Sequence, residues 1–253
     1  MTLFEVVTLV GLGLLAGVLI GAVGIGGVIL VPALVYFDGV PIHAAIAGAM
    51  MSYLLTGLVG TLVYARAKSI QWNMVGWLWA GAMPAALGGA LAANVAPSAL
   101  LEILIGLLTV SSGLQSLFSG ADVKMPDATT ISNPALGCIG AMTGFLSALS
   151  GTGGPLILVP ILLYLELPVL TAVGLSQVIQ LPIALLATAG NLGYGSLDVV
   201  LGGLLALGLA FGTWAGAATA HAVPRAALRR MVSLVLVIVG ISIFINLAVR
   251  LLT

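Results

Sequence analysis

The sequence predicts an all-α polytopic membrane protein with two inverted-topology repeats, each a broken or re-entrant helical hairpin followed by three transmembrane helices. Of its 253 residues, 61% are hydrophobic and only 6% are charged, and the mean hydropathy is +1.29. Soluble domains carry about 25% charged residues. Apolar runs such as residues 72–93 and 231–249 are long enough to cross a hydrocarbon layer about 30 Å thick. An internal repeat completes the argument.

The charge and cysteine content exclude several classes of function. The formal net charge is zero and the chain has no basic run, so nothing in it favours binding of nucleic acid. Cys138 is the only cysteine, which excludes an internal disulfide and a cysteine metal cluster. We expect no cofactor and no metal. Residues 3–20 lack a basic n-region and a small-residue cleavage pattern, so we expect a retained segment rather than a signal peptide.

The repeat becomes visible when each residue is compared with the residue 127 positions later. Matching glycines and prolines are stronger evidence than matching leucines, which coincide by chance in an apolar chain. The matched pairs include Gly24 with Gly151, Gly26 with Gly153, Gly27 with Gly154, Gly76 with Gly203, Gly81 with Gly208, Gly89 with Gly216, Pro97 with Pro224 and Gly113 with Gly240. One residue is missing from the first half between its glycines and Pro32, which therefore pairs with Pro160. We infer a duplication.

The repeat divides the chain into a first membrane repeat (residues 1–120), a polar linker (residues 121–133) and a second membrane repeat (residues 134–253). Each repeat shows a long apolar segment, a glycine-rich break, a short apolar segment and three longer spans. In the first repeat we expect these at residues 3–23, 24–27, 28–37, 42–65, 72–93 and 100–118. In the second we expect them at residues 134–149, 150–154, 155–165, 169–189, 199–220 and 226–249.

Basic residues predict the orientation of the two repeats, because cytoplasmic loops carry an excess of Lys and Arg. Arg66 and Lys68 lie in a loop whose equivalent, residues 193–198, has no basic residue. The second pair of loops shows the reverse bias. Residues 93–98 contain no basic residue, whereas the equivalent region of the second half carries basic residues at 225, 229 and 230. This bias predicts inverted repeats, with the linker and these basic loops cytoplasmic and both termini outside. The first two segments of each repeat then form a re-entrant hairpin, or else both cross by tilting or unwinding.

The two glycine-rich breaks are the most informative segments for function. They consist of Gly24, Ile25, Gly26 and Gly27 in the first half, and of Ser150, Gly151, Thr152, Gly153 and Gly154 in the second. Backbone groups freed at membrane depth need partners. If each break opens the short helix that follows, the free N–H groups and the helix dipole form an anion site. The alternative is that the glycines only allow close packing, which we expect for the stripes at residues 13, 17 and 21 and at residues 208, 212 and 216.

Neutral polar side chains near the breaks are candidates to complete the site. Gln177 and Gln180 share one helix face, and Ser52 lies near Met50 and Tyr53, the equivalents of these glutamines in the first half. Each is as compatible with an interhelical hydrogen bond as with a ligand contact. No charged residue falls in the middle of a predicted span, so neutral donors would hold an anion. No pattern of nucleophile and base or of paired carboxylates is visible at membrane depth, which argues against an enzyme.

The chain resembles the sulfite exporter TauE/SafE family, also grouped as a permease family for sulfonates and related anions. The residues that carry the resemblance are the paired stretches at 24–32 and 151–160, each running from the glycines of a break to a proline. The resemblance covers nearly the whole chain. It implies transport of sulfite, organosulfonates or other small organic anions across a bacterial inner membrane.

We therefore expect a multi-pass secondary transporter in a bacterial inner membrane, with a small anion and membrane lipid as its partners. Export is the expected direction, and alternating access around a site between the breaks is the expected mechanism. A passive anion channel and an uptake permease for organic carboxylates are the alternatives. Stripes of small residues leave both a monomer and a homodimer open.

Overall fold

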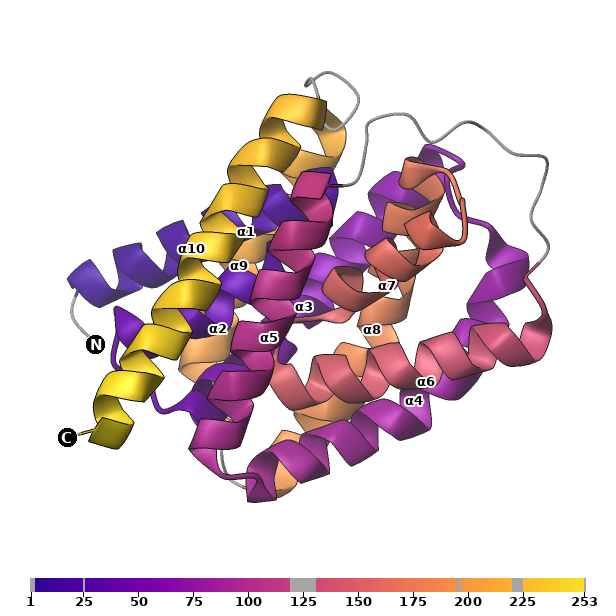
Figure 1. Cartoon of the computed structure of the whole chain (residues 1–253). Helices are drawn as coiled ribbons and strands as arrows, with labels where there is room; N and C mark the ends of the chain where they lie inside the picture. Colours follow the sequence, from indigo (N-terminus) through magenta and orange to yellow (C-terminus); the bar gives the residue numbers. More distant parts are fainter. Residues whose placement is uncertain (1–2, 25, 119–130, 195–196, 220–224, 253) are drawn as a thin grey trace.

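The computed structural model describes residues 3–24, 26–118, 131–194, 197–219 and 225–252, and within these ranges it contains ten helices and no strand (Figure 1). The helices are α1 (Leu3–Val23), α2 (Gly27–Tyr36), α3 (Ile42–Arg66), α4 (Trp72–Val95), α5 (Ser98–Phe118), α6 (Asn133–Ser150), α7 (Gly154–Tyr164), α8 (Val169–Gly193), α9 (Val199–Thr219) and α10 (Arg225–Leu252). The predicted all-α class is confirmed.

Prolines mark several helix starts, as the sequence predicts. Pro134 and Pro155 occupy the first turns of α6 and α7, where the missing N–H of proline costs no helical hydrogen bond. The largest difference from the predicted bounds is at the end of α8, which continues past Ala189 to Gly193. Tertiary contact holds this extra turn, because Asn94 Nδ2 of α4 donates a 2.8 Å hydrogen bond to Asn191 Oδ1.

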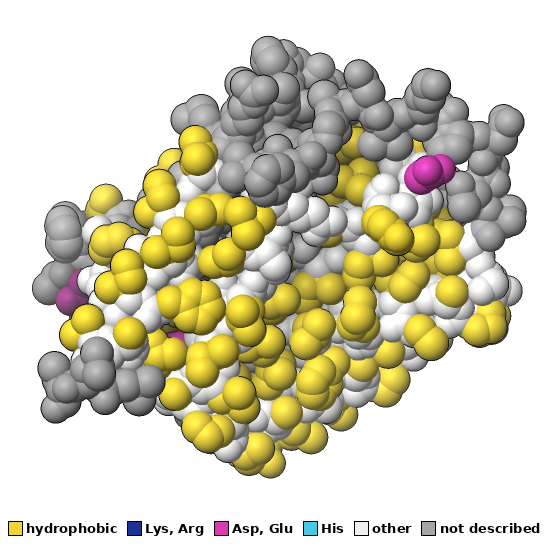
Figure 2. Space-filling model, viewed as in Figure 1, with side chains coloured by type: hydrophobic (Ala, Val, Ile, Leu, Met, Phe, Trp, Pro, Cys, Tyr) yellow, Lys and Arg dark blue, Asp and Glu magenta, His cyan; other side chains and the backbone are white. Residues whose placement is uncertain are grey.

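The surface of the helical bundle is apolar. Among the described residues, six helices are long and apolar enough to cross a membrane, namely α1, α3, α4, α5, α8 and α9. Figure 2 shows hydrophobic side chains over most of the face formed by α4, α5, α6 and α10, with no described Lys or Arg in view. Large side chains exposed on these helices include Leu87, Leu107, Phe145 and Ile245. A surface of this kind suits lipid, and the protein is a multi-pass membrane protein.

The most extensive helix contacts join the two halves of the chain, α1 with α9 and α4 with α6. Glycine stripes make both contacts close. A Cβ atom on Gly17 would overlap the carbonyl oxygen of Leu209, and one on Gly212 would overlap that of Leu14. The predicted packing role of both stripes is thereby confirmed.

The same kind of contact recurs between α4 and α6, at residues related by the 127-residue offset. A Cβ atom on Gly144 of α6 would overlap the carbonyl oxygen of Ala82 in α4. Gly144 is the equivalent of Gly17, and Leu209 is the equivalent of Ala82. Equivalent positions in the two halves thus make equivalent contacts, which places each long helix of one half against the other half.

The helices α1 and α2 form a hairpin whose outer ends lie on one side of the molecule, at the lower left of Figure 1. Burial raises the pKa of Asp38, which follows α2, and the carboxylate of Glu5 near the start of α1 raises it further. This repulsion requires the two carboxylates to be near neighbours. The inner end of the hairpin is the first glycine-rich break, in the interior of the bundle.

The middle of α8 contains a proline and receives a hydrogen bond from a side chain of α4. Pro182 has no N–H, so the carbonyl oxygen of Val178, four residues earlier, loses its helical partner. Trp79 Nε1 of α4 donates a 3.2 Å hydrogen bond to that oxygen. The indole therefore fixes α8 next to the glutamines at 177 and 180.

We expect Trp79→Phe to lower the free energy of unfolding by about 1–3 kcal/mol, because it leaves a buried carbonyl without a donor. Trp77→Phe is the matched control, since Trp77 is exposed on the same helix. Thermal unfolding of both variants in the same detergent measures the difference. Equal stability of the two variants would contradict this role for Trp79.

Candidate functional site

Both glycine-rich breaks interrupt a helix at the predicted positions, and both use backbone conformations that favour glycine. Gly24 has φ +80°, Gly151 has φ +69° and Gly153 has φ +78°. Gly151 ends α6 in the left-handed conformation, in which a Cβ atom would be unfavourable. Gly26 differs from its counterpart Gly153, because its φ of −70° is that of a right-handed helix. The two breaks are therefore related but not identical in shape.

The two breaks lie against each other in the interior. A Cβ atom on Gly27 would overlap the carbonyl oxygen of Thr152, so the start of α2 lies directly on the second break. Each break also packs on the short helix of the other half. Gly24 faces Val159 of α7, and Gly151 faces Val31 of α2.

Tyr53 of α3 connects the breaks. Its hydroxyl donates a 2.8 Å hydrogen bond to the carbonyl oxygen of Gly27 and lies 3.3 Å from the carbonyl oxygen of Gly151. The side chain is fully buried, and its ring would be 3.3 Å from a Cβ atom on Gly153. One phenol therefore touches the start of α2 and both left-handed glycines of the second break.

Other side chains donate to the carbonyl groups that the breaks leave free. Ser147 Oγ donates a 2.9 Å bond to the carbonyl oxygen of Gly153, and Tyr64 Oη donates a 2.9 Å bond to that of Gly21. Ser150 Oγ and Thr152 Oγ1 lie 2.8 Å apart. The bonds from Ser147 and Tyr64 satisfy backbone acceptors that would otherwise be costly to bury.

The remaining predicted site residues occupy different positions relative to the breaks. Gln177 Nε2 donates a 3.3 Å bond to the carbonyl oxygen of Ile20 at the end of α1, which places this glutamine beside the first break. Gln180 is buried one turn further along α8. Ser52 Oγ donates to Ala49 within its own helix, so its hydrogen is already used. Ile25 lies outside the described residues.

Tyr53 is the residue that the sequence reasoning did not select. In the sequence, Tyr53 stands out only as the equivalent of Gln180. Because Gln180 is a predicted site residue, this equivalence was the signal that could have pointed to Tyr53. Trp79 is a second residue whose role the sequence does not reveal. Its bond to Val178 could be anticipated only from the proline at 182 together with the contact between α4 and α8.

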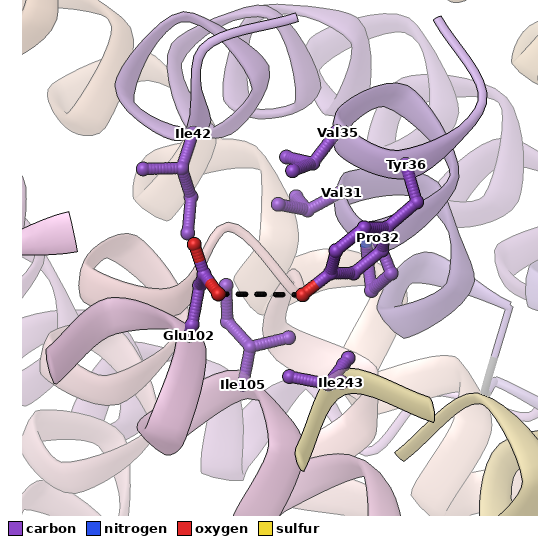
Figure 3. Close-up of a pocket in the computed structure, with 8 residues that line it drawn as sticks. All are labelled: Val31, Pro32, Val35, Tyr36, Ile42, Glu102, Ile105 and Ile243. Atoms are coloured by element: carbon purple, nitrogen blue, oxygen red, sulfur yellow. Dashed lines mark hydrogen bonds between the residues drawn. The ribbon is translucent and has the colours of Figure 1, made fainter. Parts of the chain in front are cut away.

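Every described residue of both breaks is buried, from Gly24 to Gly27 and from Ser150 to Gly154. A ligand therefore cannot reach the breaks in this conformation without a movement of the surrounding helices. A separate crevice lies between α2, α3, α5 and α10 (Figure 3). In it, Tyr36 Oη lies 3.3 Å from Glu102 Oε2, and the other lining side chains, such as Val31 and Ile105, are apolar.

Comparison with known proteins identifies the family. The family model described as sulfite exporter TauE/SafE matches residues 9–243. The chain belongs to this sulfite exporter TauE/SafE family. The match includes both breaks, Tyr53, and the helices that pack on them.

Three relatives of this chain support a role in membrane transport. The chain is 27% identical to a probable membrane transporter protein of Methanocaldococcus jannaschii, over 92% of this chain and 93% of the relative. It is 28% identical to the probable membrane transporter protein YdhB of Bacillus subtilis, over 90% and 95%. It is 25% identical to the probable membrane transporter protein YunE of the same organism, over 94% and 95%. No solved structure matches. The chain is thus a membrane transporter of the TauE/SafE type.

Proposed function

We propose that this protein is a secondary transporter that exports a small anion, such as sulfite or an organosulfonate, bound between the two glycine-rich breaks. The observation that carries the proposal is the contact of both breaks with Tyr53. The short helices α2 and α7 begin at these breaks without a side-chain cap. Their first N–H groups and positive dipole ends suit an anion without any charged side chain.

The proposal includes an inverted repeat with two re-entrant hairpins, α1–α2 and α6–α7. It is supported by the matched contacts of equivalent residues, such as Gly17 on Leu209 and Gly144 on Ala82. Inverted repeats commonly hold their substrate at broken helices near the membrane midplane and alternate its access to the two sides. The burial of both breaks corresponds to an occluded state in that cycle.

We place the protein in the inner membrane of a bacterium, with the loop that carries Arg66 and Lys68 on the cytoplasmic side. The linker, residues 121–133, and the basic loop near 225 would lie on the same side, with both termini outside. Lipid surrounds the apolar faces of the bundle. A homodimer would use one of these faces.

Flux measurements in proteoliposomes test the proposed function. Purified protein is reconstituted, and uptake of ³⁵S-labelled sulfite is followed with and without unlabelled sulfite or a short sulfonate inside. Saturable uptake that accelerates with internal unlabelled anion supports a carrier, because counterflow requires a site that alternates between the two sides. The direction is tested in cells, where a deletion strain should accumulate sulfite and the gene should restore its release.

The alternatives predict different results in the same vesicles. A channel gives rapid flux without counterflow. An uptake permease for carboxylates gives counterflow with short carboxylates and none with sulfur oxyanions. Either result would replace the proposed substrate or mechanism.

We expect Tyr53→Phe to slow sulfite flux and to lower the free energy of unfolding by about 1–3 kcal/mol, because the carbonyl groups of both breaks lose their shared donor. Tyr164→Phe is the matched control, since Tyr164 is 83% exposed at the end of α7. Flux and thermal unfolding are measured for both variants. If Tyr53→Phe behaves like the control in both assays, the phenol does not hold the breaks together.

A further inference from the structure

The side chains of Gln177 and Gln180 leave two acceptor atoms without a partner in the interior of the protein. Both Oε1 atoms are buried and neither accepts a hydrogen bond, and the exposed fractions of the two side chains are 0% and 1%. A buried carbonyl without a donor costs about 1–3 kcal/mol. Two such atoms one turn apart on the same face of α8 are therefore suited to a positively charged or hydrogen-donating ligand.

The orientation of the Gln177 amide follows from its neighbours. Its Nε2 donates to the carbonyl oxygen of Ile20, and exchanging the nitrogen and the oxygen would place two acceptors against each other. The amide oxygen is consequently the atom left over. The Gln177 Oε1 atom lies against Gly60 of α3. A Cβ atom on Gly60 would overlap this oxygen, so only glycine leaves room for it here.

The surroundings favour a cation over a second anion. The C-terminal end of α1 carries the negative end of the helix dipole. The carbonyl oxygen of Ile20 in its last turn already accepts from Gly24 N and from Gln177 Nε2. Tyr53, Tyr64 and Ser147 already donate to other carbonyl oxygens of the breaks. Among the described residues no cluster of three His, Cys, Asp or Glu is present, so the available ligands are neutral oxygens. Neutral amide and backbone oxygens suit a monovalent hard cation better than Zn²⁺ or another transition metal.

We propose that the Oε1 atoms of Gln177 and Gln180 bind a monovalent cation such as Na⁺ beside the negative end of the α1 dipole. Broken-helix transporters use unwound carbonyl groups and helix C-terminal ends for coupling cations. The first break lies beside this position, so cation and anion would neutralise each other inside the bundle. The coupling role depends on the proposed function, but binding of the cation does not.

The experiment measures thermal unfolding of the detergent-purified full chain in NaCl, KCl and N-methyl-D-glucamine chloride at equal ionic strength. A saturable rise in melting temperature of several degrees with Na⁺ or K⁺, relative to the bulky cation, is expected because a ligand of the folded state stabilises it. An equal melting temperature in all three salts overturns the proposal. It would mean that a water molecule satisfies the two oxygens.

Variants assign the effect to the two glutamines. Gln177→Leu and Gln180→Leu should lose the cation-dependent shift, whereas Gln177→Glu retains an oxygen and should restore it. Gln71→Leu is the matched control, because Gln71 is exposed before α4. A full shift in both leucine variants overturns the assignment. If a leucine variant does not fold, the melting temperature of Gln177→Glu and the cation titration of the unaltered protein still test whether the cation binds.

Flux separates this proposal from the proposed function. Sulfite flux that increases several-fold along an imposed Na⁺ or K⁺ gradient, and is insensitive to that gradient in Gln180→Leu, supports coupling. A cation-dependent melting temperature without any sulfite flux supports the cation site and contradicts the proposed substrate. Sulfite flux that is the same in N-methyl-D-glucamine chloride, together with no shift in melting temperature, contradicts the cation site and supports the proposed substrate.

Discussion

Replacing Gly153 with alanine is expected to reduce sulfite flux to background while the protein still inserts and folds. Gly153 has φ +78° and ψ 163°, a region that is essentially restricted to glycine, and another residue there costs about 1–3 kcal/mol. The added Cβ atom would also lie 3.3 Å from the ring of Tyr53. Both effects shift the start of α7, where we propose that the anion binds.

Gly39→Ala is the control for backbone strain alone. Gly39 has φ +66° in the loop between α2 and α3, and no atom lies within 4 Å of a Cβ atom built there. We expect a similar loss of stability with sulfite flux retained. Flux, melting temperature and membrane insertion are measured for both variants. Unimpaired flux in Gly153→Ala would remove the second break from the transport site.

The second large effect is expected where the glycines of α4 contact α6. A Cβ atom on Gly89 would overlap the carbonyl oxygen of Phe145, a backbone atom that cannot rotate away. We expect Gly89→Ala to lower the free energy of unfolding by about 1–3 kcal/mol, the usual cost of overpacking. Gly89→Leu should prevent assembly of the bundle.

The adjacent residue provides the matched control. Gly88 is exposed, and no atom lies within 4 Å of a Cβ atom built on it. Gly88→Ala is expected to keep or raise stability, by up to about 1 kcal/mol, because alanine favours a helix over glycine and meets no neighbour here. Thermal unfolding in one detergent compares the two alanine variants. Equal melting temperatures would show that α4 and α6 separate enough to accept a methyl group.

The outcome at the breaks shows how far local sequence can predict this protein. Gly24, Gly151 and Gly153 were expected to interrupt helices, and all three have positive φ. This prediction succeeds because a glycine cluster acts through its own backbone freedom and needs no information about neighbours. The asymmetry between Gly26 and Gly153 is different. It depends on the tight fit of Gly26 against Ala16 and Ile20 of α1, which composition does not reveal.

The polar residues illustrate the opposite case. Gln177, Gln180 and Ser52 were predicted together because they are neutral polar residues in the span that follows each break. The structure separates them, since Ser52 bonds within its own helix while the two glutamines keep an unpartnered oxygen. Whether a polar side chain is satisfied depends on atoms more than a hundred residues away, such as the carbonyl oxygen of Ile20 that binds Gln177.

The sequence by itself determined that this is a helical membrane protein, where its helices begin and end to within a few residues, where they break, and that its halves correspond. These features follow from hydrophobic length, from proline and glycine, and from the 127-residue offset, all of which act locally or by simple comparison. Only the tertiary structure decided that α1 packs on α9 and α4 on α6, that Tyr53 joins the two breaks, and that two glutamine oxygens remain without a donor. Almost every helix here is apolar on all sides. The hydrophobic pattern of a helix therefore does not predict which other helix it packs against. The choice is made by close contact of small residues and by hydrogen bonds between distant segments.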